Sequence, residues 1–355
     1  MQRAANELSQ VVRQHFLMHP ARIACFLAMI WGIMGARKAQ LWAIAQQFGG
    51  NAQQESRIKR ISRFLWDQAL TWDCTAQCII AFLDISGPVT LVIDRTNWSF
   101  GKTERNFLTL AIVHHGNAIP IFIKDLSRPG NSDTEDRKAL LRRFITLFGA
   151  DRIGCLLADR EFVGQEWFVW LQENQVRSCI RVRNNTLMRH KNGGKVPVKN
   201  LLRDLKIGDY RTWKERLYGH DWRAVGLKLP DGDVLVLMAD PDLPENLLPL
   251  YKIRWTIECL FKNQKTSGFS WETSHLLHPE RGEKLAIVMA LASAFAIKEG
   301  LIQHAIKPIP FRKTVDTLLF SFFTYGLRTL ADAFKNTPHA INNPLILNGV
   351  YESVR

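Results

Sequence analysis

The stretch "YKIRWTIECLFKNQK", residues 251–265, decides how the rest of the sequence is interpreted. At 100° per residue on an α-helix, its charged and tyrosine side chains fall within an arc of roughly 80°. The apolar side chains lie on another side, so the helix packs there. A salt-bridged surface stripe is one interpretation, because Glu258 and Lys262 form a favourable i,i+4 pair. The aligned residues are Tyr251, Arg254, Glu258, Lys262 and Lys265.

The net charge favours a polyanionic partner. The 355 residues contain 47 Lys and Arg against 33 Asp and Glu, a formal net charge of +14. Such an excess favours nucleic acid ahead of a membrane surface. The apolar content of 46% is enough for a globular core, and the length indicates two or three modules.

Two apolar runs, 23–36 and 285–297, are shorter than the roughly 20 residues that a membrane span needs. We therefore expect buried helices and no membrane association. The six cysteines form no zinc-type pairs and lie mostly in apolar runs. Reduced thiols in the bacterial cytoplasm, associated with the nucleoid, are the expected setting.

Residues 1–85 are predicted to be helical, because apolar positions recur at three- and four-residue intervals. Breaks are expected at Pro20 and at Gly49-Gly50. One helix of this region carries a cluster of cations without an acid. A solvated helix face explains the cluster, and so does a helix that contacts DNA. The cluster comprises Arg57, Lys59, Arg60 and Arg63.

Residues 86–183 are predicted to form the first part of an α/β core. Three strand-like runs, with a turn at "HHGN", precede helix 134–149, strand 153–162, helix 164–175 and strand 177–183. This order fits a sheet whose first three strands are antiparallel and whose later strands are parallel, as in ribonuclease-H-like folds. Segment 244–300, with a helix over 244–266 and the beginning of a helix over 281–302, would complete the core.

Residues 184–243 interrupt this alternation and are predicted to be a basic, β-rich insertion. Between 186 and 229 there are 11 Lys or Arg and four Asp or Glu. Trp213 and Trp222 lie in it, either as core residues or as rings that stack on a base. Residues 301–355, including a helical stretch over 311–335, form a helical C-terminal region with a possible role in dimerisation.

Two aspartates follow β-branched or apolar runs, in "LVIDRTNW" and "CLLADREF". We expect Asp94 and Asp159 to lie at strand ends, where a carboxylate near a core needs a partner or a metal ion. With Glu258 they provide three hard oxygen ligands, which suit Mg²⁺. Two such ions would serve phosphodiester chemistry, and Mn²⁺ could replace them. Glu161 and Asp125 are rival carboxylates, for which salt bridges are expected.

These motifs resemble the DDE transposases of the insertion sequence 4 group. The group's helix signature, Tyr-x2-Arg-x3-Glu-x6-Lys, matches Tyr251, Arg254, Glu258 and Lys265. "IDRTNW" and "LADREF" are similar to the contexts of its two catalytic aspartates, and the resemblance covers residues 88–300. It implies that Asp94, Asp159 and Glu258 bind metal and catalyse.

The resemblance also implies the partner and the reaction. Tyr251, Arg254, Lys265 and Lys262 would hold phosphates of double-stranded DNA, at inverted-repeat ends and at a target. A homodimer would cut the element out and paste it in, by hydrolysis and strand transfer; a hairpin step would need an aromatic ring such as Trp213 or Trp222. Two alternatives are a catalytically silent DNA-binding regulator and a structure-specific nuclease of the same fold.

Overall fold

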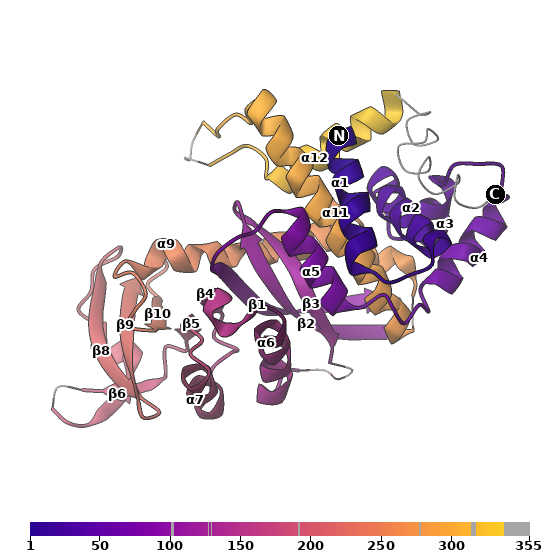
Figure 1. The fold of residues 1–355 in the computed structure, drawn as a ribbon. Helices are drawn as coiled ribbons and strands as arrows, with labels where there is room; N and C mark the ends of the chain where they lie inside the picture. The colour runs from indigo at the N-terminus through magenta and orange to yellow at the C-terminus, as the bar shows by residue number, and fades with distance from the viewer. Residues whose placement is uncertain are drawn as a thin grey trace.

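The computed structural model describes residues 1–336, apart from 101–102, 127, 129, 191, 277 and 314–316. One large mixed sheet runs through the molecule and carries helices on both faces (Figure 1). The chain is therefore a mixed α/β protein, as the sequence predicts. Residues 337–355, the end of the expected C-terminal region, lie outside the described residues.

Five helices precede the sheet, within the segment predicted to be helical. Helix α2 begins at Pro20, because proline has a helical φ and lacks the N–H that a first turn leaves unpaired. Helix α5 begins after Thr71, whose hydroxyl accepts a hydrogen bond from the Cys74 N–H. The helices are α1 (Gln2–His15), α2 (Pro20–Ala36), α3 (Leu41–Gln46), α4 (Gln54–Phe64) and α5 (Trp72–Phe82).

The first five strands follow the predicted order. Strands β1 to β3 form an antiparallel meander, while β4 and β5 run parallel to β1. His115 and Gly116 both have positive φ and connect β2 to β3 in a two-residue turn. The elements are β1 (Val89–Phe100), β2 (Thr103–His114), β3 (Asn117–Asp125), α6 (Thr134–Phe148), a 3₁₀ turn (Ala150–Arg152), β4 (Ile153–Ala158), α7 (Gln165–Glu173) and β5 (Ser178–Val182).

The basic segment 184–243 continues the central sheet. Its last strand, β10, pairs antiparallel with β5, and the strand order is β3-β2-β1-β4-β5-β10-β9-β8. Five of the six residues of β10 are buried, which explains why it lies inside the sheet. The elements are β6 (Leu187–Arg189), β7 (Lys195–Pro197), α8 (Val198–Leu201), β8 (Tyr210–Leu217), β9 (His220–Lys228) and β10 (Val234–Ala239).

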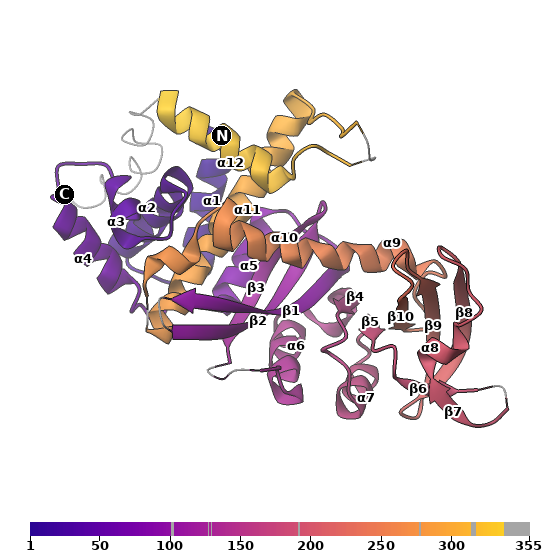
Figure 2. The ribbon, with the colours of Figure 1, turned by 180° about the vertical axis from the view of Figure 1, so that it is seen from behind.

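The signature helix crosses one face of the sheet as one long, irregular helix (Figure 2). Its side chains Ile257 and Leu260 pack on Val92 and Leu157 of the strands. Helices α6 and α7 lie on the opposite face (Figure 1). The segments are α9 (Leu247–Lys252), a 3₁₀ turn (Ile253–Trp255), α10 (Thr256–Lys262), a π-turn (Asn263–Ser267) and a 3₁₀ turn (Trp271–Ser274).

Helix α11 (Pro279–Ile306) is the central helix of the core and contains the predicted helix 281–302. By length and composition it could cross a membrane, but 83% of its apolar window is buried inside the fold. The helix predicted over 311–335 begins only at Phe322, as α12 (Phe322–Asn336). Before it, Phe311 pairs with Leu318 in an isolated antiparallel bridge, so this part of the prediction was wrong.

Helices α11 and α12 approach each other through glycine. A Cβ at Gly326 would lie 1.8 Å from the Ala296 carbonyl oxygen, and a Cβ at Gly300 would lie 2.0 Å from the Phe322 carbonyl oxygen. Both contacts involve backbone atoms, which cannot move aside as a side chain can. The position of α12 on α11 therefore requires residues without a side chain.

We expect Gly326→Ala to destabilise the protein by about 1–3 kcal/mol or more, because the added methyl forces the two helices apart. Urea denaturation measures this change. The matched control is Gly282→Ala in α11, where the new Cβ would have one contact, at 3.9 Å to the Leu276 oxygen. That variant should gain about 0.5–1 kcal/mol from helix propensity. Equal stability of the two variants would contradict the prediction.

Candidate active site

The register of two parallel strands brings Asp94 and Asp159 together. The ladder between β1 and β4 ends at the pair Ile93–Ala158, so Asp94 is the next residue on β1 and Asp159 is the first residue after β4. Neighbouring strands lie about 4.8 Å apart, which makes these residues direct neighbours. Asp94 does not end its strand as predicted, because β1 continues to Phe100 alongside β2. It lies instead where the parallel neighbour ends.

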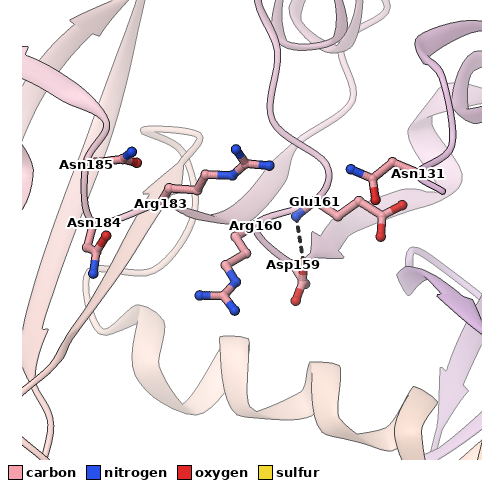
Figure 3. A pocket seen from close by; sticks show the side chains of 7 residues that line it. All are labelled: Asn131, Asp159, Arg160, Glu161, Arg183, Asn184 and Asn185. Carbon is pink, nitrogen blue, oxygen red and sulfur yellow. Dashed lines mark hydrogen bonds between the residues drawn. The ribbon is translucent and has the colours of Figure 1, made fainter.

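The two carboxylates share one face of the sheet. Side chains alternate along a strand, so Asp94 points to the same side as Val92, and Asp159 to the same side as Leu157. Val92 and Leu157 pack against the signature helix. Figure 3 shows the Asp159 carboxylate directed toward this helix. The strands thus present both acids to the element that carries Glu258.

Arg254 connects the helix to the sheet. Its Nη1 donates to Asp94 Oδ2 at 3.2 Å, and its Nη2 donates to Glu258 Oε1 at 2.5 Å. One guanidinium therefore bonds carboxylates from β1 and from α10. The Arg254 side chain is 14% exposed and that of Asp94 is 17% exposed, so solvent screens this ion pair weakly.

Burial is the main reason that the charged form of Asp94 is disfavoured. Burial raises the pKa of Asp94 from its ordinary 3.8 to about 6. The Arg95 N–H and the Arg254 charge act in the opposite direction, while Asp159 and Glu161 raise the pKa further. A buried carboxylate with a raised pKa favours the approach of a proton or a further cation.

The donor set fits a hard divalent cation in its chemistry, since carboxylate oxygens are the ligands such ions prefer. In the described part of the chain, however, no three His, Cys, Asp or Glu side chains are grouped closely enough to hold an ion. The position of Arg254 explains this, because its guanidinium lies between Asp94 and Glu258. The three acids thus belong to one site but do not surround a common position for an ion. They are Asp94, Asp159 and Glu258.

The other signature residues differ in exposure. Tyr251 is 8% exposed, and burial raises its pKa. Lys265 donates to the Asn97 carbonyl oxygen at 2.5 Å and lies 5.0 Å from the centre of the Trp98 ring. Lys262 is exposed. Of these residues, Lys262 has its charge most directly available to a polyanion.

The predicted cationic cluster lies on α4, among the N-terminal helices and away from the signature helix (Figure 2). Arg57 donates to the Gly50 carbonyl oxygen at 2.6 Å, and Arg60 donates to the Ala21 carbonyl oxygen at 3.1 Å. These two arginines therefore also hold neighbouring segments in place. Lys59 and Arg63 are exposed.

The two candidate tryptophans serve the fold. Trp222 is 1% exposed, packs on Phe168 and donates to the Leu217 carbonyl oxygen, so its ring is closed to a DNA base. Trp213 is half-buried against the core, and its indole N–H donates to Glu215 at 3.2 Å. The stacking role considered for Trp222 is therefore wrong, and its alternative role as a core residue is confirmed, because the side chain is buried in the hydrophobic core.

A pocket of about 520 Å³ opens beside Asp159, and most of the residues that line it are not among the site residues predicted from the sequence. Figure 3 shows arginine and asparagine side chains from the turns after β4 and β5 around it. Glu161 forms the expected salt bridge, to Arg95, and Asp125 forms one to Arg105. In the sequence, Arg95 and Glu161 could be recognised as parts of this site because each closely follows one of the two aspartates. The lining residues are Asn131, Asp159, Arg160, Glu161, Arg183, Asn184 and Asn185.

The match to a family model agrees with these motifs. Residues 85–295 match the family model described as "Transposase DDE domain". No curated protein matches the chain. Among the solved structures, one similar chain is described as "Cryo-EM structure of piggyBac transposase synaptic complex with hairpin DNA (SNHP)". Its TM-score is 0.42 at 11% identity, and the match covers 80% of this chain and 60% of that one.

The raised pKa of Asp94 makes a prediction about stability. The folded protein binds a proton on Asp94 more readily than the unfolded chain does, so this group lowers stability as pH rises from about 4 to about 6. Without divalent metal, the free energy of unfolding of Asp94→Asn should be higher than that of the wild type by on the order of 2 kcal/mol near pH 7. Thermal denaturation in EDTA over this pH range measures the difference.

The control is Asp221→Asn, at an aspartate whose side chain is 72% exposed. Its stability profile should run parallel to that of the wild type. If the Asp94→Asn profile also runs parallel, burial of the Asp94 charge does not cost stability.

Proposed function

Because this chain belongs to the transposase DDE-domain family, we propose that Asp94, Asp159 and Glu258 are the catalytic carboxylates of a cut-and-paste DNA transposase. One observation carries the proposal: the strand register makes Asp94 and Asp159 neighbours, and Arg254 joins Asp94 to Glu258. Asp159 lies 65 positions after Asp94 and 99 positions before Glu258 in the chain. Unrelated surface acids so far apart in sequence would not be expected to lie close together.

The three carboxylates would hold the divalent cations, Mg²⁺ or Mn²⁺. When bound, such ions supply charge stabilisation at the attacking and leaving oxygens of a phosphodiester. The raised pKa of Asp94 supports this assignment, since burial removes solvent from its carboxylate and a bound cation would stabilise the charged form. Two ions fit the chemistry of successive phosphoryl transfers at one site.

The reaction has three stages. Water attacks the phosphodiester at an inverted-repeat end, and the bond to the 3′ oxygen breaks to leave a 3′-OH. The opposite strand of the same end is then cut by a second displacement at phosphorus, which frees the element. Finally the 3′-OH of the freed end attacks a phosphodiester of target DNA, forms a new bond and displaces the 3′ oxygen of the target strand. Each stage is an in-line displacement at phosphorus, so the same carboxylates can serve all three.

Cations on the signature helix would position the DNA. Lys262 is exposed, and Lys265 and Arg254 lie on the same helix. Phosphate contacts of this kind fix the register of a duplex without reading its bases. Tyr251 lines a separate cavity beside Arg254 and would support the helix next to the DNA.

The insertion sequence 4 group and a ribonuclease-H-like core are the finer assignments that we propose. The Tyr-Arg-Glu-Lys spacing supports the first, and an antiparallel meander followed by two parallel strands supports the second. Residues 1–85 would bind DNA through α4, and residues 301–355 would contribute to a homodimer. The enzyme would act in the bacterial cytoplasm, at the nucleoid.

A catalytically silent DNA-binding regulator is the second candidate. One observation favours it: within the described ranges, Arg254 lies where three carboxylates would otherwise close around an ion. Incubation with the DNA that flanks the protein's own gene, with Mg²⁺ and mapping of 3′-OH ends, separates the two. New 3′-OH ends at the element boundary identify a transposase, and intact DNA that remains bound identifies a regulator.

Glu258→Ala should abolish Mg²⁺-dependent nicking and retain binding to the element ends, because it removes one metal ligand and leaves the phosphate contacts. Loss of a group that acts only in catalysis lowers the rate by about 100-fold or more. The control is Glu173→Ala, at an exposed residue that ends α7, and it should cleave as the wild type does. Normal nicking by Glu258→Ala would remove this residue from the catalytic set.

Lys262→Ala should reduce the salt dependence of DNA binding by about one unit of log–log slope, since one phosphate contact releases about one counterion. Fluorescence anisotropy on a duplex, at several salt concentrations, measures the slope. Lys262→Arg keeps the charge and should keep the slope. If the two variants and the wild type have equal slopes, Lys262 does not contact phosphate.

A further inference from the structure

An ion pair connects the chain segments that follow the two aspartates. Arg95 comes directly after Asp94, and Glu161 comes two residues after Asp159. Arg95 Nε donates to both carboxylate oxygens of Glu161, at 3.1 Å each. The side chains are 18% and 15% exposed, so the pair is largely shielded from water. It is a bridge between β1 and the turn after β4.

The same two residues hold the aspartates through their backbone. The Arg95 N–H donates to Asp94 Oδ1 at 2.8 Å, and the Glu161 N–H donates to Asp159 Oδ1 at 2.6 Å. One oxygen of each aspartate is thereby fixed. The other oxygen of Asp94, Oδ2, faces Arg254. The orientation of each carboxylate thus depends on the residue that forms the bridge.

The bridge is anchored in the scaffold at both ends. Arg95 Nη1 donates to the Oδ1 atoms of Asn97 and Asn106, at 2.9 and 3.1 Å, on strands β1 and β2. Glu161 accepts from the Ser132 N–H and hydroxyl, both at 3.3 Å. Arg137, which is 5% exposed on α6, donates to the Ser132 hydroxyl and carbonyl and to the Glu161 carbonyl.

We propose that Arg95 and Glu161 are positioning residues, which set the separation and orientation of Asp94 and Asp159 for metal binding. The proposal rests on the proposed function of these aspartates. The β1–β4 ladder ends at Ala158, so Asp159 lies in a turn beyond the last ladder pair. The Arg95–Glu161 bridge continues the connection between the strands where the ladder stops.

A direct role of Glu161 as a metal ligand fits the geometry less well. Both of its carboxylate oxygens accept from Arg95, and Oε1 also accepts from Ser132. Figure 3 shows its side chain extending toward Asn131, while the Asp159 carboxylate points toward the signature helix. Glu161 therefore acts on the metal site through Asp159 and Arg95.

The experiment measures Mn²⁺ affinity of the DNA-free protein by electron paramagnetic resonance, for Arg95→Gln, Glu161→Gln and the double variant. Each single variant should bind Mn²⁺ about 10–100-fold more weakly, as is typical when a group behind a metal ligand is lost. The double variant should lose much less than the product of the two factors, because both changes break one bridge. Arg95→Lys, which keeps the charge, should recover part of the affinity.

The matched control is Asp125→Asn. Asp125 pairs with Arg105 at 2.6 Å on strands β3 and β2, with side chains 13% and 12% exposed, and this pair does not bridge the aspartates. The Asp125→Asn variant should lower the melting temperature about as much as the bridge variants do, and it should leave the Mn²⁺ affinity unchanged. An equal loss of affinity in Asp125→Asn would overturn the proposal, as would single variants that bind within twofold of the wild type or a double variant with fully multiplied losses.

Asp94→Asn separates this proposal from the proposed function. Weaker Mn²⁺ binding in Asp94→Asn, with unchanged binding in the bridge variants, would reject the positioning role alone. Unchanged Mn²⁺ binding in Asp94→Asn would reject the metal site itself, and the positioning role with it.

Discussion

The parallel register between β1 and β4 is the constraint on which the site depends. It aligns Ile93 with Ala158, and an aspartate follows each of them in the chain. Strand alternation then turns both carboxylates to the face that the signature helix covers. A shift of one residue in β4 would move Asp159 to the opposite face, toward α6 and α7. The apolar residues Leu156 and Ala158, which pack on that opposite face, oppose such a shift.

Arg254 shows how the protein offsets the negative charge of this arrangement. Burial disfavours the charge on Asp94, and the neighbouring acids disfavour it further. The guanidinium bonds Asp94 and Glu258 and so offsets part of their charge. The same bonds keep the three carboxylates from closing around an ion. The buried charge of Asp94 thus lowers stability, as the proposed catalytic role of this residue would require.

The sequence predicted the elements that local patterns specify and missed those that depend on distant pairing. The signature helix, the helix capped by Asp133 and the strand order through β5 follow from periodicity and turn residues. The place of Asp94 within β1 could not be predicted, because its position depends on where a strand 60 residues later ends. The pairing of β10 with β5 likewise depends on contacts between distant segments.

The irregularity of the signature helix coincides with its candidate functional residues. Arg254 lies in a 3₁₀ turn and Lys265 in a π-turn, while Glu258 lies in the regular α-helix between them. A 3₁₀ turn is wound more tightly than an α-helix and a π-turn less tightly, so the two change side-chain directions in opposite senses. Arg254 and Glu258 still lie on one side of the helix, because they are four residues apart and their side chains bond at 2.5 Å. Lys265 in the π-turn reaches the Asn97 carbonyl of β1.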